Sequence, residues 1–121
     1  MIESIAGITI WSENSKSLSE FYKNVLELPI HSVRPDFVSF KFGPIRLNIG
    51  SHSKVRSRAP DPFRIMLNLS VNDIKNTYEI LLTKKVKFIR PPEKEHWGGW
   101  VATFFDTDGN ILQLLQQPQQ T

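Results

Sequence analysis

The stretch that decides the fold is Phe104-Phe105-Asp106-Thr107-Asp108-Gly109-Asn110-Ile111-Leu112-Gln113-Leu114. Two apolar runs flank a polar segment, and this pattern predicts a β-hairpin closed by a short loop. Gly109 takes positive φ without steric cost, and aspartate and asparagine side chains bond to turn backbone. A calcium loop counted from Asp106 needs glycine sixth and glutamate twelfth, but Gly109 is fourth and the twelfth residue is Gln117. Calcium is therefore excluded.

Length and composition bound the class of protein. With 121 residues and 40% hydrophobic content, the chain is expected to form a single domain, 1–121, with an adequate core. No apolar run approaches the roughly 20 residues of a membrane span, so no membrane partner is expected. The N-terminus lacks the features of a signal peptide, and there is no cysteine for a disulfide, a thiolate metal site or a nucleophile. The expected location is the cytoplasm.

The charge is mildly basic, with a net value of +3. The basic residues gather in two groups, Lys54 to Arg64 and Lys84 to Arg90. A nucleic-acid-binding domain normally adds a recognisable reading element, and none is visible here. We therefore expect no nucleic-acid partner. Most of these side chains are interpreted as solvated loop residues, and attraction of an acidic small ligand is the alternative.

The same pattern of elements occurs twice along the chain. In module one, about 4–50, a strand at 4–11 precedes a helix with Leu18, Phe21, Tyr22, Val25 and Leu26 on one face, and strands follow at 30–34, 37–42 and 45–50. A polar linker occupies about 51–62. In module two, about 63–116, a strand at 63–71, a helix from Ile74 to Leu82, a strand at 86–89 and the hairpin repeat the plan.

Local signals mark the ends of these elements. Ser12, Asn14 or Ser15 is expected to cap the first helix, and Asn72-Asp73 the second. Pro91-Pro92 is expected to end the strand at 86–89.

Three stretches carry a resemblance to one family. The hairpin resembles the Asp-Pro-Asp-Gly-Asn-x-x-Glu-Leu signature of vicinal-oxygen-chelate domains, which include glyoxalases, extradiol dioxygenases and bleomycin-resistance proteins. The segment from Gly7 to Leu26 is similar to the opening strand and Phe-Tyr-x-x-x-Leu helix of that family, and 65–74 to the start of its second module. The resemblance implies an α+β fold of two βαβββ modules that form an open, curved mixed sheet around a cavity.

Strand alternation predicts which side chains face that cavity. Ile8, Ile10, Ile45, Leu47, Ile49, Ile65, Leu67, Leu69, Val71, Leu112 and Leu114 are expected on the helix side or in the core. The alternate residues of these strands are expected to face the cavity: Gly7, Thr9, Trp11, Arg46, Asn48, Met66, Asn68, Ser70 and Gln113, together with His52 at the rim. Polar residues thus recur on one face of several strands, which also fits an ordinary solvated sheet face.

The metal ligands implied by the resemblance fall on Gly7, Asn48, Met66 and Gln113. A hard divalent ion prefers carboxylates and imidazoles. Glycine offers no donor, methionine a soft thioether, and the two carboxamides are weak neutral ligands. We therefore expect no metal at these positions and no other cofactor.

Histidine and glutamate provide the remaining acid–base candidates. His31, His52 and His96 lie in different segments without metal-ligand spacing, and each is interpreted as a surface or rim residue. Glu95-His96 is a possible acid–base pair in a loop that resembles the cavity edge of the family. Whether the protein is an enzyme stays open at this point.

The aromatic residues favour ligand binding. Trp11 faces inward by parity, and Trp97 and Trp100 flank Gly98-Gly99, where the backbone can approach a ligand. Such rings suit a flat aromatic or cationic guest. The expected ligand-binding residues are Trp11, Asn48, His52, Met66, Asn68, Trp97, Trp100 and Gln113.

The predicted function is metal-independent binding or sequestration of an organic small molecule, as in the bleomycin-resistance proteins that the chain resembles. A glyoxalase- or dioxygenase-like enzyme with an unconventional metal or acid–base site is the alternative, and an accessory protein without a ligand is a third reading. A homodimer is also expected, because relatives commonly pair their modules and a short chain gains from burying more apolar surface.

Overall fold

The structure, a computed structural model, describes residues 1–119. The chain divides into two compact units, Met1–Ser57 (unit 1) and Arg58–Thr121 (unit 2), with the division inside the segment 51–62. No helix in the described residues is long and apolar enough to cross a membrane.

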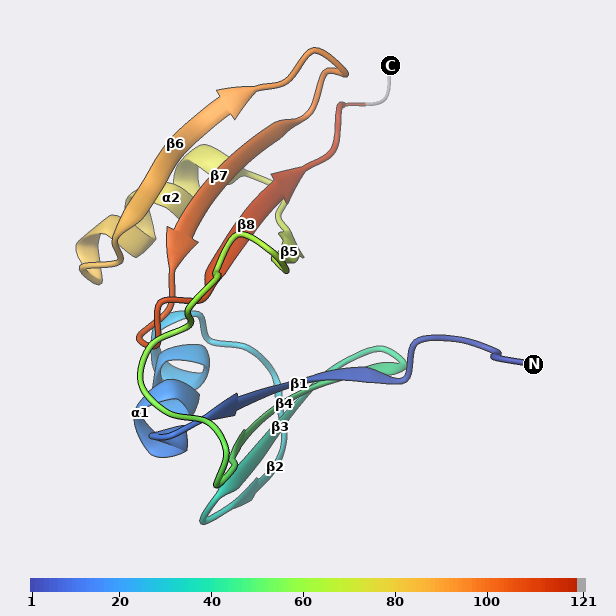
Figure 1. Ribbon diagram of the computed structural model, residues 1–121. Helices are drawn as coiled ribbons and strands as arrows, with labels where there is room; N and C mark the ends of the chain where they lie inside the picture. Colours follow the sequence, from blue (N-terminus) through green and yellow to red (C-terminus); the bar gives the residue numbers. More distant parts are fainter. Residues whose placement is uncertain (120–121) are drawn as a thin grey trace. The chain divides into compact units, whose positions relative to one another are not determined.

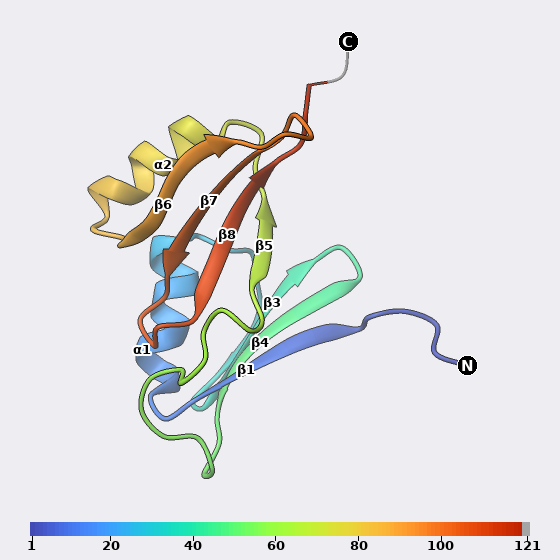
Figure 2. The same cartoon turned by 45° about the horizontal axis from the view of Figure 1, so that its top comes forward.

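Unit 1 is a four-stranded sheet with one helix (Figure 1). Its elements are β1 (Gly7–Ser12), α1 (Ser15–Glu20), a π-helical turn (Phe21–Val25), β2 (Ile30–Arg34), β3 (Phe37–Phe42) and β4 (Ile45–Ser51). The strand order is β1-β4-β3-β2; β1 runs parallel to β4, and the other neighbours are antiparallel. Figure 2 shows β1 beside β4 at the edge of this sheet.

Helix α1 and one face of this sheet form the core of unit 1. Of the three capping candidates, Asn14 is the one that caps the helix, accepting from the Ser17 backbone N–H at 3.3 Å. The helical segment buries Leu18, Phe21 and Tyr22, and the sheet buries Val38, Phe40, Leu47 and Ile49. Because alternate residues of β3 and β4 face the helix, Ser39, Arg46 and Asn48 lie on the other face, here called the open face.

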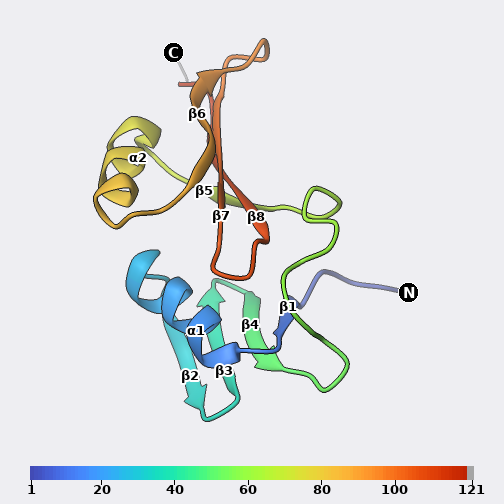
Figure 3. The same ribbon diagram turned by 60° about the vertical axis from the view of Figure 1, so that its left-hand side comes forward.

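Unit 2 repeats the plan of unit 1. Its elements are β5 (Leu67–Ser70), α2 (Ile74–Thr83), β6 (Phe88–Lys94), β7 (Trp100–Phe105) and β8 (Ile111–Gln116). The strand order is β5-β8-β7-β6, with β5 parallel to β8, so each strand takes the place of its counterpart in unit 1. Figure 3 shows α2 on one side of this sheet. The predicted α+β fold of two βαβββ modules with open mixed sheets is confirmed.

Aromatic contacts join α2 to its sheet. The Tyr78 and Phe88 rings meet edge to face with centroids 4.6 Å apart, and Phe88 in turn lies 5.3 Å from Phe104. Asp73 caps α2 by accepting from the Asn76 backbone N–H at 3.1 Å. Leu112 and Leu114 complete this core, as alternation along β8 predicts.

The hairpin between β7 and β8 has the predicted turn. Gly109 has φ of 83°, in the region that favours glycine. The buried Asp106 carboxylate accepts from the backbone N–H groups of Asp108 and Asn110, each at 2.9 Å, and from the Asn110 side-chain amide at 2.9 Å. This carboxylate therefore stabilises the turn through hydrogen bonds.

Several local expectations are wrong. The first strand begins at Gly7 rather than at residue 4. The strand expected at 63–71 covers only Leu67–Ser70, so Ile65 precedes it and is 78% exposed instead of lying in the core. Ile8 and Ile45 are also exposed rather than buried, and both lie near the ends of their strands.

Pro91-Pro92 does not end β6, which continues to Lys94. This strand lies at the edge of its sheet and, within residues 1–119, pairs only with β7; the register shifts between Arg90 and Glu93. Proline lacks a backbone N–H, so it is tolerated on an edge strand, where one side of the backbone forms no ladder, and at irregularities. The sequence pattern alone does not say which strand is an edge.

Candidate functional site

The open face of unit 1 is organised in three rows of side chains that run across the strands. The parallel pairing of β1 with β4 and the antiparallel pairing of β3 with β4 fix these rows. The first row contains Trp11, Gly50 and Phe37; the second contains Thr9, Asn48 and Ser39; the third contains Gly7, Arg46 and Lys41.

The second row is a hydrogen-bonded chain. The Ser39 hydroxyl donates to Asn48 Oδ1 at 2.7 Å, and Asn48 Nδ2 donates to Thr9 Oγ1 at 3.2 Å. Ser39 is buried, whereas Thr9 is exposed. The carboxamide of Asn48 thus lies on the predicted face, held by neutral partners on both sides.

The first row is aromatic. The rings of Trp11 and Phe37 lie 6.1 Å apart, and the ring of His52 meets Trp11 edge to face at 5.3 Å. Gly50 lies between the two large rings: a Cβ there would be 2.7 Å from Phe37 Cδ2 and 2.8 Å from Trp11 Cζ3. Glycine is therefore required for the rings to close over this strand, while Trp11 remains 41% exposed.

The third row is cationic. Arg46 and Lys41 are direct partners in the pairing of β3 with β4, so their side chains leave the same face. Gly7 completes the row on the other side, and a Cβ at Gly7 would lie 2.6 Å from the Arg46 carbonyl oxygen. Neither cation forms an ion pair within residues 1–119.

The face of unit 2 opposite α2 also carries carboxamides. Gln113 Nε2 donates to Asn68 Oδ1 at 2.9 Å across the parallel pair β5–β8. Thr103 is the partner of Gln113 on β7, and Arg90 is the partner of Thr103 on β6. Met66 lies one residue before β5 and is partly exposed. Asn68 and Gln113 thus form a second polar row that the parity of the sequence predicted.

An ion-pair cluster occupies the β6 end of that row. The Arg90 guanidinium pairs with Glu93 and, at 2.9 Å, with Glu95. The hydrogen bonds that Arg90 donates to Glu93 and then to Glu95 raise the pKa of Arg90, so this side chain keeps its charge.

The acid–base pair Glu95-His96 gains no support from this geometry. The Glu95 carboxylate is engaged by Arg90, and His96 is exposed. In unit 1, His52 Nδ1 accepts from the backbone N–H of Lys54 at 3.0 Å, which ties this ring nitrogen to the loop. We found no cluster of three or more histidine, aspartate or glutamate side chains able to hold a metal among residues 1–119.

Of the two tryptophans of unit 2, Trp100 is placed differently from the expectation. Gly99 lies against the ring of Trp97, since a Cβ on Gly99 would be 1.9 Å from that ring, so this glycine makes room for the indole. Trp100 shares the α2 side of the sheet with Phe104, and Lys75 Nζ of α2 lies 4.6 Å from its ring centroid. Trp100 and Gln113 therefore lie on opposite faces of one sheet, because a single step along a strand reverses the side-chain direction.

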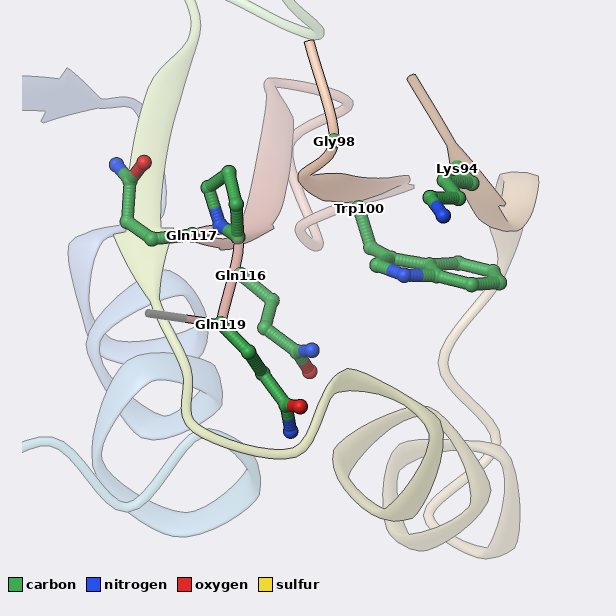
Figure 4. Close-up of a pocket in the computed structure, with 7 residues that line it drawn as sticks. Lys94, Gly98, Trp100, Gln116, Gln117 and Gln119 are labelled. Atoms are coloured by element: carbon green, nitrogen blue, oxygen red, sulfur yellow. The ribbon is translucent and has the colours of Figure 1, made fainter. Parts of the chain in front are cut away.

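Trp100 lines a pocket of about 430 Å³ at the end of unit 2, together with Lys94, Gly98, Gln116, Gln117, Pro118 and Gln119 (Figure 4). The volume lies within the range of ligand pockets. Its lining includes three glutamines and one lysine, and Gln116 Oε1 already accepts from the Ile74 backbone N–H at 2.7 Å. The sequence pattern indicated Trp100 as a binding residue because it flanks Gly98-Gly99. It did not predict this pocket, because the pocket depends on the course of the chain after β8.

The side chains at the four family metal positions are poor donors for a hard divalent ion. Asn48 is committed to Ser39 and Thr9, and Gln113 to Asn68. Gly7 has no side chain, and any Cβ there meets the Arg46 backbone. Met66 offers only a thioether, which hard divalent ions bind poorly.

Comparison with known proteins gives a consistent result. A family model described as the Glyoxalase/Bleomycin resistance protein/Dioxygenase superfamily matches residues 4–114. The Bacillus subtilis (strain 168) protein YetH is 24% identical over 121 residues, which cover 96% of this chain and 100% of YetH.

Solved structures share the fold. A member of the same superfamily from Sphaerobacter thermophilus DSM 20745 has a TM-score of 0.72 at 26% identity, covering 96% of this chain and 98% of that one. A lactoylglutathione lyase from Agrobacterium tumefaciens has a TM-score of 0.74 at 15% identity, covering 95% and 94% respectively. At that identity the lyase shows a common fold and nothing about the reaction.

Proposed function

The chain belongs to the Glyoxalase/Bleomycin resistance protein/Dioxygenase superfamily, and we propose that it is a metal-independent member that binds or sequesters an organic small molecule. The observation that carries this proposal is the chemistry of the family metal positions. Two of them hold carboxamides engaged with neutral hydrogen-bond partners, and neither of the others holds a carboxylate or an imidazole. Metal-assisted chemistry would need the ligands that are missing.

The open face of unit 1 supports a binding role. Apolar rings, a hydrogen-bonding row and cations lie on neighbouring rows of one sheet face. Ligand sites commonly combine apolar surface with a few well-placed polar groups. The alternative hypothesis of an enzyme with an acid–base site has less support, because the Glu95 carboxylate pairs with Arg90.

Native mass spectrometry of the purified protein, followed by tryptophan-fluorescence titration with aromatic, cationic and anionic small molecules, tests the binding proposal. We expect saturable binding of at least one class, with a signal that falls in Trp11→Leu. If no organic compound is retained or bound, the proposed function is wrong. If a bound compound is turned over and Glu95→Gln or His96→Ala abolishes turnover, the enzyme reading replaces it.

Metal analysis gives a separate prediction. After exposure to zinc, nickel, manganese or iron and then desalting, we expect elemental analysis to find no stoichiometric ion, because the family positions lack hard anionic donors. Gln113→Leu serves as the matched variant, since it removes one of the two carboxamides. An ion bound at about one per chain in wild type and lost in this variant would show that the metal-free reading is wrong.

A further inference from the structure

We propose that the open face of unit 1 recognises an elongated ligand with a planar aromatic ring at one end, a hydrogen-bond acceptor in the middle and an anionic group at the other end. This inference rests on the proposed function, and it names the class of ligand. It also adds Phe37, Gly50, Arg46 and Lys41 to the site.

The register sets the order and the spacing of the three groups. Gly50, Asn48 and Arg46 are alternate residues of β4, so they leave the same face of the strand. Two residues of a strand advance by roughly 6.6 Å, which puts the outer rows about 13 Å apart. Long side chains on the cationic row shorten the distance that a ligand has to bridge.

The ring is placed by the aromatic row. Trp11 and Phe37 are tilted by 51° to one another over Gly50, and His52 packs against the edge of Trp11. Exposing 41% of a tryptophan leaves apolar ring surface in water. A planar guest removes that surface from water and adds ring–ring contact.

The middle row presents a donor. Ser39 donates to Asn48, and Asn48 donates to Thr9, so the Thr9 hydroxyl oxygen already accepts. Its own proton is then directed away from Asn48, and Thr9 is exposed. A hydroxyl held in this way suits an acceptor on the ligand, such as an amide or ester carbonyl.

The anion is placed by the cationic row. Like charges directly opposite each other in a sheet are destabilising, and Arg46 faces Lys41 in that position. The four strands of unit 1 contain no aspartate or glutamate that would compensate. An anion bound between the two cations removes their repulsion, and an arginine fork fits a carboxylate or a phosphate equally well.

Arg34 makes the face still more positive, but at another place. It is the β2 partner of Phe37, so its side chain belongs to the aromatic row. An Arg34 variant therefore distinguishes a general positive field from an anion held at the Arg46 row.

The test uses a matched set of probes: N-(2-naphthoyl)glycylglycine, its C-terminal amide, its C-terminal phosphonate isostere, and N-acetylglycylglycine, which lacks the ring. Isothermal titration calorimetry of the 121-residue chain is expected to show the acid binding at least 10-fold more tightly than the amide, and the ring-free acid binding more weakly than both. The phosphonate shows whether phosphate serves as well as carboxylate.

Variants locate the groups. Arg46→Gln is expected to reduce the preference for the acid over the amide to less than about 3-fold, Lys41→Gln to reduce it partly, and Gly50→Ala to weaken all three ring-bearing probes. Lys16→Gln removes the same charge from α1 on the other layer of unit 1 and is expected to change nothing. Circular dichroism of each variant confirms that it is folded.

The outcomes separate this inference from the proposed function. If wild type binds the amide as tightly as the acid, or if Arg34→Gln rather than Arg46→Gln removes the preference, the ligand class or its orientation is wrong, although organic binding stands. If wild type binds none of the four probes, the inference is also wrong. The proposed function fails only if the broad panel of aromatic, cationic and anionic compounds shows no binding at all.

Discussion

Asp106→Ala is expected to lower the free energy of unfolding by about 3–5 kcal/mol, because it removes a buried carboxylate that accepts at least three hydrogen bonds. The two backbone N–H groups and the Asn110 amide would lose their acceptor inside the turn that connects β7 to β8. Urea denaturation followed by tryptophan fluorescence measures this loss.

Two further variants calibrate the effect. Asp106→Asn keeps an oxygen for the two backbone donors but places an amide against Asn110 Nδ2, so a smaller loss, about 1–2 kcal/mol, is expected. Asp61→Ala removes an exposed aspartate of the same unit that pairs with Arg64, and it should stay within about 0.5 kcal/mol of wild type. A loss below about 1 kcal/mol for Asp106→Ala would show that the turn does not depend on its carboxylate.

The elements that sequence reasoning predicted well have strong local signals. The strands β2, β3 and β4 match their predicted bounds within one residue, since proline and glycine separate them. Alternation also predicted that Asn48 and Gln113 lie on the sheet faces opposite the helices, because successive side chains of a strand point to opposite faces. The hydrogen bonds of these carboxamides to Thr9 and Asn68 then depend on a register that the pattern does not give.

The side-chain positions that the sequence did not predict share a physical origin. Trp97 and Trp100 were grouped because they flank two glycines, yet the ring of Trp97 folds onto Gly99 and Trp100 takes the α2 side. Proximity in the sequence does not determine side-chain direction here, because Trp97 lies in the loop and β7 begins at Trp100. The aromatic row of unit 1 depends likewise on Gly50 standing opposite Phe37, which only the pairing of β3 with β4 reveals.

Asn48→Asp is expected to have the largest effect on binding of the anionic probe. It places a negative charge in the second row, two residues along β4 from Arg46. Unit charges about 7 Å apart at an effective dielectric constant near 20 interact by roughly 2 kcal/mol, which corresponds to about 10- to 50-fold in affinity. The acid should weaken by this factor in titrations that contain a chelator, while the amide should change by less than about 3-fold.

Measuring the stability of two variants distinguishes an effect of the charge at position 48 from an effect of lost hydrogen bonding and packing. An aspartate at position 48 still accepts from the buried Ser39 hydroxyl, and the Thr9 hydroxyl can turn to donate, so the fold should persist. Asn48→Leu instead leaves the Ser39 hydroxyl without its acceptor, and it should cost about 1–3 kcal/mol of unfolding free energy and weaken the acid and the amide alike. If Asn48→Asp binds the acid as tightly as wild type does, the anion does not lie beside this row, and the charge on Arg46 and Lys41 serves another purpose.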